Sequence, residues 1–318
     1  MKLIGIIVAI SALTACSAGK SAENSDTISA AEEQASAPAF NADSAYSYVE
    51  TMVEFGPRVP NTEAHRKAGD WLAEKMTEFG WSVKTQEADL KAFDGTVLKA
   101  RNIFAQINPD AGSRLLLLAH WDCRPWADQD PDPAKRSQPV DGANDGASGV
   151  GVLLEIARQL GINGTERGVD ILFVDAEDWG SDGDEDSWAM GTRYFTENPV
   201  IAGYKPAQAI LLDMVGSPEA RFGVEYFSGQ SNPALINEVW SAAAALGHGK
   251  YFHNGFGGAV TDDHVQLIEH GIPAIDIIDY REGDGFDPVW HTSLDGMHNI
   301  SRDTLGAVGE TILYVINN

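Results

Sequence analysis

Side chains that can bind zinc follow several of the apolar runs that predict buried strands. These side chains are His120 and Asp122 after 115–119, Glu177 and Asp178 after 169–174, and Asp213 after 208–212. In an open α/β sheet, ligands bind outside the carboxyl ends of the strands, so we expect these groups to converge there. Histidine, aspartate and glutamate on one rim are the ligands that zinc chemistry requires.

Asp145 and His291 complete this pattern. Asp145 lies in the glycine-rich turn 142–149, just before a predicted helix, and His291 follows Trp290 near the C-terminus. Alone, Asp145 could simply cap the helix, and His291 could be a structural histidine. Together with Asp178 they would supply three protein ligands and leave one position open, which is the arrangement of a catalytic zinc site.

The same groups leave a second arrangement open. His120 and Asp213 could bind a second metal ion that Asp145 bridges. Asp122 could orient an imidazole from outside the ligand shell. Glu177 would point away from its neighbouring ligand on an extended chain end, which leaves it free to face a substrate.

The elements that must position these groups alternate along the chain. Helical spacing of apolar residues predicts helices at 42–54, 63–79, 149–160, 232–246, 262–270 and 302–316. Strand-like runs lie at 82–89, 100–106, 115–119, 169–174, 208–212 and 274–278. The early strands predict a hairpin or meander, and the later ones alternate with helices as βα units do. We therefore expect an α/β fold with a central mixed, mainly parallel sheet sandwiched by α-helices.

Length, charge and missing motifs narrow the class of protein. With 318 residues and 43% hydrophobic composition, the chain has room for a sizeable core. The formal net charge of −25 argues against nucleic acid as a partner and favours a cationic substrate, such as a peptide with a free α-ammonium group. The sequence contains no G-x-S-x-G nucleophile elbow and no Walker-type phosphate loop. The paired carboxylates of a glycosidase would give His291 no role.

The N-terminus has the features of an export signal. Lys2 precedes the apolar run 3–13, and the ending at Cys16 resembles a bacterial lipoprotein signal, in which the cysteine is lipidated. The sequence predicts a signal peptide at 1–15, a flexible tether at 16–39 after lipidated Cys16, and one catalytic domain at 40–318. We expect the bacterial cell envelope as the location, with the domain periplasmic or surface-exposed, and Ser17 indicates the outer membrane. A plain secretory signal is the alternative.

The order of the motifs resembles the zinc aminopeptidase superfamily. The matching motifs are His120-Trp121-Asp122, Gly142-Ala143-Asn144-Asp145, Asp175-Ala176-Glu177-Asp178, Leu212-Asp213 and Val289-Trp290-His291. Within that superfamily, further matches resemble the glutaminyl-peptide cyclotransferases, or glutaminyl cyclases. These are Phe55-Gly56-Pro57-Arg58, Arg124-Pro125, Thr261-Asp262-Asp263-His264, and Phe286 placed four residues before Trp290. The resemblance extends from about residue 45 to the C-terminus.

The resemblance implies one catalytic zinc ion per chain and a set of residue roles. The implied zinc ligands are Asp145, Asp178 and His291; the implied proton shuttle is Glu177, in a network with Asp213 and Asp262; the implied pocket walls are Trp290, Phe286 and Val260. Animal cyclases have glutamate as the middle ligand, where this chain has aspartate. They also have a tryptophan where Gly183 falls here, so Trp179 or Trp188 is expected to complete the pocket.

The implied activity is conversion of the N-terminal glutamine of peptides or proteins to pyroglutamate, with release of ammonia. We expect the neighbouring Asp213 to raise the pKa of Glu177 so that it can both accept and return a proton. The main rival is a two-zinc aminopeptidase that releases N-terminal amino acids, in which His120 and Asp213 would bind the second ion. A non-catalytic, tethered peptide-binding lipoprotein is the third possibility.

Overall fold

The computed structural model describes residues 39–318, which form one unit by their contacts. The predicted signal peptide, Cys16 and the tether up to residue 38 lie outside the described residues. Between residues 39 and 318, no helix combines the length and apolar character needed to cross a membrane.

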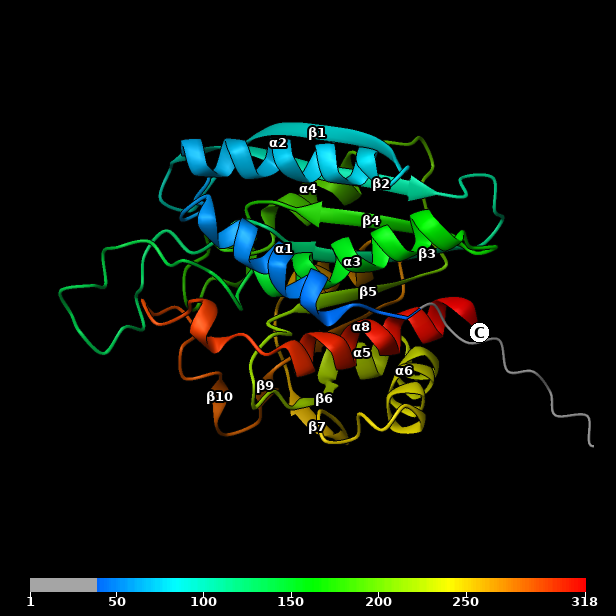
Figure 1. Cartoon of the computed structure of the whole chain (residues 1–318). Helices are drawn as coiled ribbons and strands as arrows, with labels where there is room; N and C mark the ends of the chain where they lie inside the picture. The colour runs from blue at the N-terminus through cyan, green and yellow to red at the C-terminus, as the bar shows by residue number, and fades with distance from the viewer. Residues whose placement is uncertain (1–38) are drawn as a thin grey trace, which may run out of the picture. The chain divides into compact units, whose positions relative to one another are not determined.

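A six-stranded sheet in the order β1-β2-β4-β3-β5-β8 forms the centre of the fold (Figure 1). Its strands are β1 (Ser82–Lys91), β2 (Val97–Ile107), β3 (Arg114–His120), β4 (Gly168–Val174), β5 (Gln208–Asp213) and β8 (Ala274–Ile278). Strands β1 and β2 form an antiparallel hairpin, and β2 is antiparallel to β4. The remaining pairs, β4 with β3, β3 with β5 and β5 with β8, are parallel. The predicted mixed, mainly parallel sheet is confirmed.

Helices cover both faces of this sheet. They are α1 (Ala42–Glu54), α2 (Glu63–Glu78), α3 (Ala147–Asn163), α4 (Met190–Glu197), α5 (Tyr226–Ser231), α6 (Pro233–Ala245), α7 (Asp263–Glu269) and α8 (Arg302–Asn317). In β3, Leu115 and Leu117 pack in the core that contains α1, α2, α3 and α8. Leu116 and Leu118 pack on the opposite face, against Phe195 of α4. Because both faces are covered, the strand is an unbroken apolar run in the sequence.

Several short elements have no counterpart among the predicted ones. They are α4, α5, two 3-10 turns at Glu185–Ser187 and Met297–Asn299, and the strands β6 (Phe222–Glu225), β7 (Phe252–Gly258), β9 (Tyr280–Arg281) and β10 (Gly285–Phe286). Strands β6 and β7 pair where Gly223 meets Gly257; a Cβ on Gly223 would lie 2.5 Å from the Cα of Gly257. Such short, glycine-rich segments carry too few apolar residues to show a period.

Two glycines position the start of α3 beside the end of β5. Gly146 has a positive φ of 98°, and a Cβ there would collide with the carbonyl oxygen of Asp122. A Cβ on Gly149 would collide with the carbonyl oxygen of Leu212. Because both positions lack a side chain, the turn that carries Asp145 lies directly against the end of β3, and the start of α3 lies against the end of β5. The helix therefore begins at Ala147, slightly before the predicted boundary.

Candidate active site

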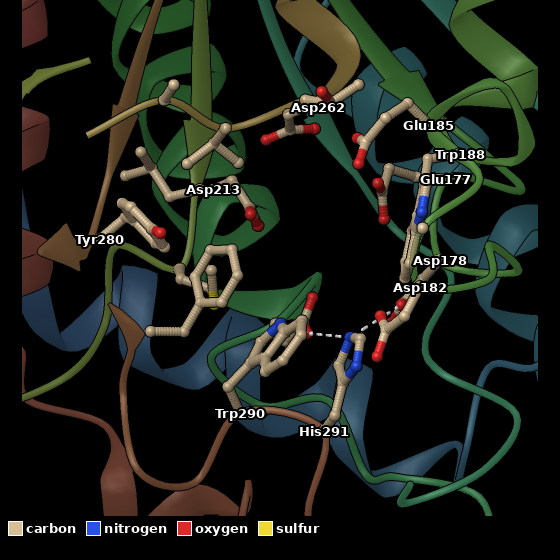
Figure 2. Close-up of a pocket in the computed structure, with 18 residues that line it drawn as sticks. Glu177, Asp178, Asp182, Glu185, Trp188, Asp213, Asp262, Tyr280, Trp290 and His291 are labelled. Atoms are coloured by element: carbon tan, nitrogen blue, oxygen red, sulfur yellow. Dashed lines mark ion pairs between the residues drawn. The ribbon is translucent and has the colours of Figure 1, made fainter. Parts of the chain in front are cut away.

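Three connections at the carboxyl ends of the strands bring the predicted zinc ligands together (Figure 2). Asp145 precedes α3, Asp178 follows β4, and His291 lies between β10 and α8. His291 Nε2 is 3.1 Å from Asp178 Oδ1 and 3.5 Å from Asp145 Oδ2. One candidate ligand atom from each residue lies within 4.8 Å of the others. We call these three residues the zinc triad, because they are close enough to share one ion.

The zinc triad also fits a metal ion by its burial and chemistry. Its members are only 5%, 1% and 2% exposed, in chain order. Neither carboxylate oxygen of Asp178 accepts a hydrogen bond from any described residue. A buried carboxylate without donors is costly unless a cation balances it. Two carboxylates and one imidazole form a zinc ligand set that leaves a position open for substrate.

The electrostatics of the zinc triad favour positive charge. Burial, and then the charge of Asp145, raise the pKa of Asp178 to about 6. Burial opposes protonation of His291, but the charge of Asp178 and the contact with Asp128 outweigh it and raise the pKa of His291 to about 9. The carboxylates therefore attract either a proton on His291 or a metal ion that replaces it.

Asp295 holds the turn that carries Asp145. Its carboxylate accepts the backbone N–H groups of Asn144 at 2.8 Å and Asp145 at 3.0 Å. Asp295 is 1% exposed and follows His291 in the same connection, so it ties two zinc-triad segments together. Sequence reasoning missed it, because nothing in the local pattern distinguishes it from an ordinary loop acid.

Arg124 and Asp128 hold the other two ligands. Arg124 donates to the carbonyl oxygen of Asp178 at 3.0 Å and forms an ion pair of 2.6 Å with Asp128. Asp128 in turn lies 3.4 Å from His291 Nδ1. A carboxylate behind a ligating imidazole fixes the orientation of the ring. Asp128 was also missed, since its only sequence signal is its spacing of four residues from Arg124.

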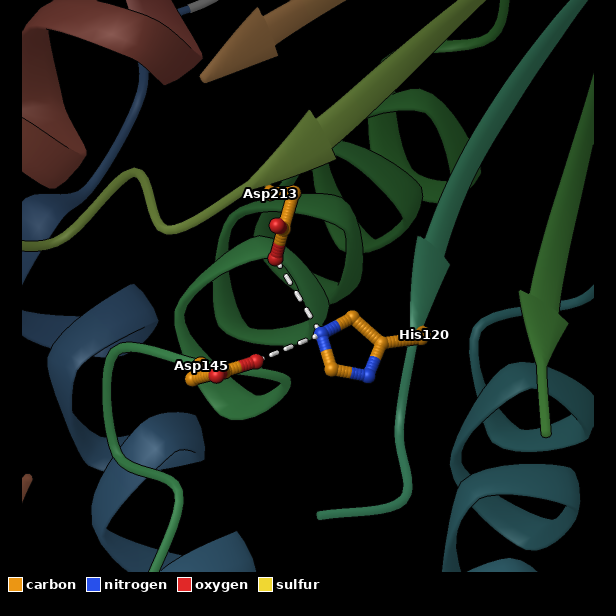
Figure 3. A group of neighbouring side chains, drawn as sticks. All are labelled: His120, Asp145 and Asp213. Carbon is orange, nitrogen blue, oxygen red and sulfur yellow. Dashed lines mark hydrogen bonds and ion pairs between the residues drawn. The ribbon is translucent and has the colours of Figure 1, made fainter. Parts of the chain in front are cut away.

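A second group of three, which we call the second triad, shares Asp145 with the first (Figure 3). His120 Nε2 lies 3.1 Å from both Asp145 Oδ1 and Asp213 Oδ1, and the contact with Asp213 is a hydrogen bond. Asp122 lies 3.5 Å from His120 Nδ1, and it also accepts the backbone N–H of Glu177. The predicted outer position of Asp122 therefore agrees with its contacts.

Glu177, Asp213 and Asp262 face the same space from different elements (Figure 2). Burial raises the pKa of Glu177 well above its usual value; His120 opposes this shift, and the charge of Asp262 adds to it. Nearby acids therefore raise the pKa of Glu177, as expected, and the contribution of Asp213 stays a prediction. Asp213 itself forms a hydrogen bond to His120. Burial and then Asp213 raise the pKa of Asp262 to about 7.

The three acids and the zinc triad line one pocket of about 410 Å³. The predicted walls Trp290, Phe286 and Val260 are all among its lining residues. The rings of Phe286 and Trp290 stack with centroids 4.4 Å apart. None of the lining residues is lysine or arginine. The pocket therefore combines an apolar wall with an acidic floor.

Trp188, and not Trp179, lines this pocket. Its ring stacks against His291 at 6.0 Å, and Gly180 leaves room for it. Trp179 instead packs edge-on against Trp126 at 5.5 Å. The choice that the sequence left open is thus decided by the fold of the connection after β4, which returns Trp188 to the pocket.

Comparison with known proteins agrees with this geometry. The model of the peptidase family M28 matches residues 102–316. The crystal structure of Porphyromonas gingivalis glutaminyl cyclase is 52% identical with a TM-score of 0.86, and the match covers 88% of this chain and 98% of that one. A Zn-dependent exopeptidase from Parabacteroides distasonis is also 52% identical, with a TM-score of 0.87 and coverage of 89% and 99%.

A more distant relative comes from an animal. Glutaminyl-peptide cyclotransferase of Bos taurus is 24% identical over 238 residues, which is 64% of this chain and 62% of the bovine protein. The chain thus spans less than two thirds of the length of this curated relative.

Proposed function

This chain belongs to peptidase family M28, and we propose that it is a zinc-dependent glutaminyl-peptide cyclotransferase. It converts the N-terminal glutamine of a peptide or protein to pyroglutamate and releases ammonia. The reaction is an acyl transfer, because the γ-acyl group moves from the amide nitrogen to the α-amine of the same residue. The high identity to a solved bacterial glutaminyl cyclase over nearly the whole described domain supports this proposal.

One observation carries the proposal: Glu177 and the zinc triad line a single pocket with stacked aromatic walls. Such a pocket can hold one side chain with its amide beside a proton carrier. The walls of Trp290, Phe286 and Trp188 exclude bulk water, so that attack by the substrate's own amine is favoured over hydrolysis.

The chain's own residues supply proton transfer and orientation. As the α-amine nitrogen bonds to the carbonyl carbon of the side-chain amide (Cδ), Glu177 accepts the proton that the amine loses. Glu177 then returns a proton to the amide nitrogen, and the bond from that nitrogen to Cδ breaks, which releases ammonia. Because amine and carbonyl belong to one residue, proximity contributes substantially to the rate. Asp145, Asp178 and His291 would hold a zinc ion, which when bound would supply Lewis-acid polarisation of the side-chain carbonyl.

The surroundings of Glu177 suit a group that must both take and give a proton. A carboxylate with an ordinary pKa would hold a proton too weakly to return it at neutral pH. Burial and the neighbouring Asp262 raise the pKa of Glu177, which brings it closer to the working range. Asp213 and Asp262 then complete the acid network around the shuttle.

The proposal includes one zinc ion per chain, held by Asp145, Asp178 and His291. We also propose that the chain is exported and anchored by a lipid on Cys16. The signal peptide is then residues 1–15, the tether 16–39 and the single catalytic domain 40–318. The protein is then held in the bacterial cell envelope, at the outer membrane, with the domain periplasmic or surface-exposed. The apolar run 3–13 and its ending at Cys16 support this part.

A direct test is incubation of the zinc-loaded protein with a peptide that begins with glutamine. We expect a mass loss of one ammonia and an intact peptide chain. Glu177→Gln keeps the shape of the side chain but cannot exchange the proton, so kcat should fall by about 10²–10⁴-fold with zinc still bound. Asp170→Asn, a buried aspartate on β4 outside the pocket, is the matched control.

Other products would support the alternatives. Release of free N-terminal amino acids from many peptides, together with two zinc ions per chain, would favour the aminopeptidase. Peptide binding without any product would favour the non-catalytic lipoprotein. Full activity of Glu177→Gln would remove Glu177 from the shuttle role.

A further inference from the structure

Behind Asp262 lies a group of buried polar side chains that the proposed reaction does not use. Glu225 is at the end of β6, His264 is in α7 and Asp276 is in β8. They are 2%, 0% and 0% exposed, and none of them lines the pocket. Charged and titratable groups so deeply buried are costly unless they are paired or shared. Their contacts therefore indicate what they do.

Glu225 is an ionised anchor for this group. Its carboxylate accepts the backbone N–H groups of Phe227, Ser228 and Val260 and the hydroxyl of Ser228, at 2.7 to 3.2 Å. Burial opposes its charge, but the hydrogen bond from His264 and these backbone donors outweigh it and lower the pKa of Glu225. A carboxylate with so many donors has no need of a proton of its own.

Glu225 fixes which nitrogen of His264 carries hydrogen. His264 Nε2 lies 3.0 Å from Glu225 Oε2, and because an ionised carboxylate only accepts, Nε2 is the donor. The other nitrogen, Nδ1, is 3.7 Å from Asp276 Oδ2. Within the described part of the chain, neither Nδ1 nor either oxygen of Asp276 has a hydrogen-bond partner.

Two buried acceptors thus face each other with nothing between them. Since no lysine or arginine among the described residues pairs with Asp276, the compensating charge must be a proton or a small cation. Asp262 belongs to the same group, because one oxygen of its carboxylate lies within 4.8 Å of candidate ligand atoms of both His264 and Asp276. Its Oδ1 accepts the N–H of Asp263, and its Oδ2 has no partner among described residues.

We propose that Glu225, His264 and Asp276 form a buried proton relay that positions Asp262 and sets how readily it exchanges a proton during the reaction. His264 and Asp276 are positioning residues, since they act on the substrate only through Asp262. A proton shared between His264 Nδ1 and Asp276 is the simplest charge that satisfies both acceptors. For its kinetic test, this inference rests on the proposed cyclase activity.

Charged neighbours of Asp262 shift its pKa in both directions. Asp213 at the end of β5 is the carboxylate that most raises the pKa of Asp262, and His264 lowers it. Asp262 is also among the charges that raise the pKa of Asp263 and of Asp276. Loss of His264 should therefore shift the titration of Asp262 to higher pH.

The kinetic test uses the full zinc-loaded protein and a peptide that begins with glutamine. In the profile of kcat against pH, the limb that is due to titration of Asp262 is identified by its disappearance in Asp262→Asn. His264→Gln should move this limb to higher pH by about half a unit to one unit. His264→Gln and Asp276→Asn should both lower kcat by about tenfold with KM within about twofold. Asp170→Asn should leave the limb in place. A limb that stays in place or moves to lower pH in His264→Gln would overturn the relay.

A second measurement does not depend on activity. The ring nitrogen signals of His264 in ¹⁵N-histidine spectra are assigned by their loss in His264→Gln. They should move in both Asp276→Asn and Asp262→Asn and stay unchanged in Asp170→Asn. If Asp262→Asn leaves them unchanged, the two groups are not coupled and the relay is wrong. If a folded Asp276→Asn protein contains one metal ion fewer per chain, a cation fills the gap and the relay is also wrong.

The two measurements separate failure of the relay from failure of the proposed function. A wild-type protein that does not cyclise any glutamine peptide contradicts the cyclase, and the spectra then decide on the relay alone. A wild-type protein that cyclises, with variants whose pH limb does not move, contradicts only the relay. Thermal unfolding of each variant shows whether it is folded before either result is read.

Discussion

The zinc triad and the second triad contain the same residue types and share Asp145, yet their contacts differ. In the second triad, His120 Nε2 forms a hydrogen bond to Asp213 at 3.1 Å and lies equally close to Asp145. In the zinc triad, the oxygens of Asp178 accept no hydrogen bond from the described residues, although His291 Nε2 is 3.1 Å away. Asp213 thus has a hydrogen-bond partner within the second triad, whereas the carboxylate of Asp178 has no hydrogen-bond donor among the described residues.

The difference shows how one scaffold can hold one ion or two. Burial opposes a proton on His120, but its contacts with Asp122, Asp145 and Asp213 outweigh it and raise the pKa of His120 well above its usual value. A protonated His120 places positive charge where a second ion would bind. The same ligand set in an aminopeptidase needs that proton to leave first. In both triads, therefore, a metal ion must replace a proton on the histidine before it can bind.

Loss of a zinc-triad carboxylate should have the largest effect. Asp178→Asn removes a charged ligand from the zinc triad, so the protein should lose its zinc and at least about 10³-fold in kcat/KM. Metal content by mass spectrometry and cyclisation of a glutamine peptide measure the two losses. Asp170→Asn, equally buried but outside the pocket, should keep both. An Asp178→Asn protein with its full zinc content would contradict the assignment.

Loss of a second-triad carboxylate should have a smaller effect of a different kind. Asp213→Asn removes the partner of His120 and part of the acid network, so kcat should fall by about 10–100-fold with the zinc content unchanged. Metal analysis beside the activity assay distinguishes the two triads. The comparison breaks down if Asp213→Asn loses an ion, since the second triad would then be a metal site too.

The affinity for zinc should depend on pH through the protonation of the zinc-triad residues. The pKa of His291 in the metal-free protein is raised to about 9 and that of Asp178 to about 6. Between these values His291 must lose its proton before zinc binds, so affinity should fall about tenfold for each unit by which the pH decreases. Below pH 6, Asp178 is protonated as well and the fall should steepen. Competition with a chelator at several pH values measures the slope, and an affinity independent of pH would contradict it.

The smallest expected effect concerns exposed acids at the pocket, in contrast to the buried ones of both triads. Asp182 and Glu185 line the pocket, are exposed, and form no ion pair among the described residues. Asp182→Asn with Glu185→Gln should lower kcat/KM about two- to fivefold for a peptide with lysine after the glutamine, and only at low salt. A peptide with alanine at that position is the control. Equal loss for both peptides would show that these acids do not select by charge.

Much of the fold could be predicted because strands that are buried on both faces are unbroken apolar runs in the sequence. The unbroken apolar runs of β3 and β4, and the polar groups that follow each, indicated a parallel sheet with a site at its carboxyl edge. The elements that were missed are short: β6 and β7 depend on contacts between glycines, and the 3-10 turn at Glu185–Ser187 is too brief to show a period. Local patterns do not record pairings of this kind.

The residue types and their order by themselves indicated the fold class and the residues that could bind zinc, because strand ends in a parallel sheet must meet at one edge. Only the tertiary structure decided that Trp188 reaches the pocket, that Asp128 and Asp295 contact the segments of the zinc triad, and that Asp262 lines the pocket close to the buried His264. These contacts join connections that are far apart in the chain. Spacing along the sequence carries no information about how such connections fold back on one another.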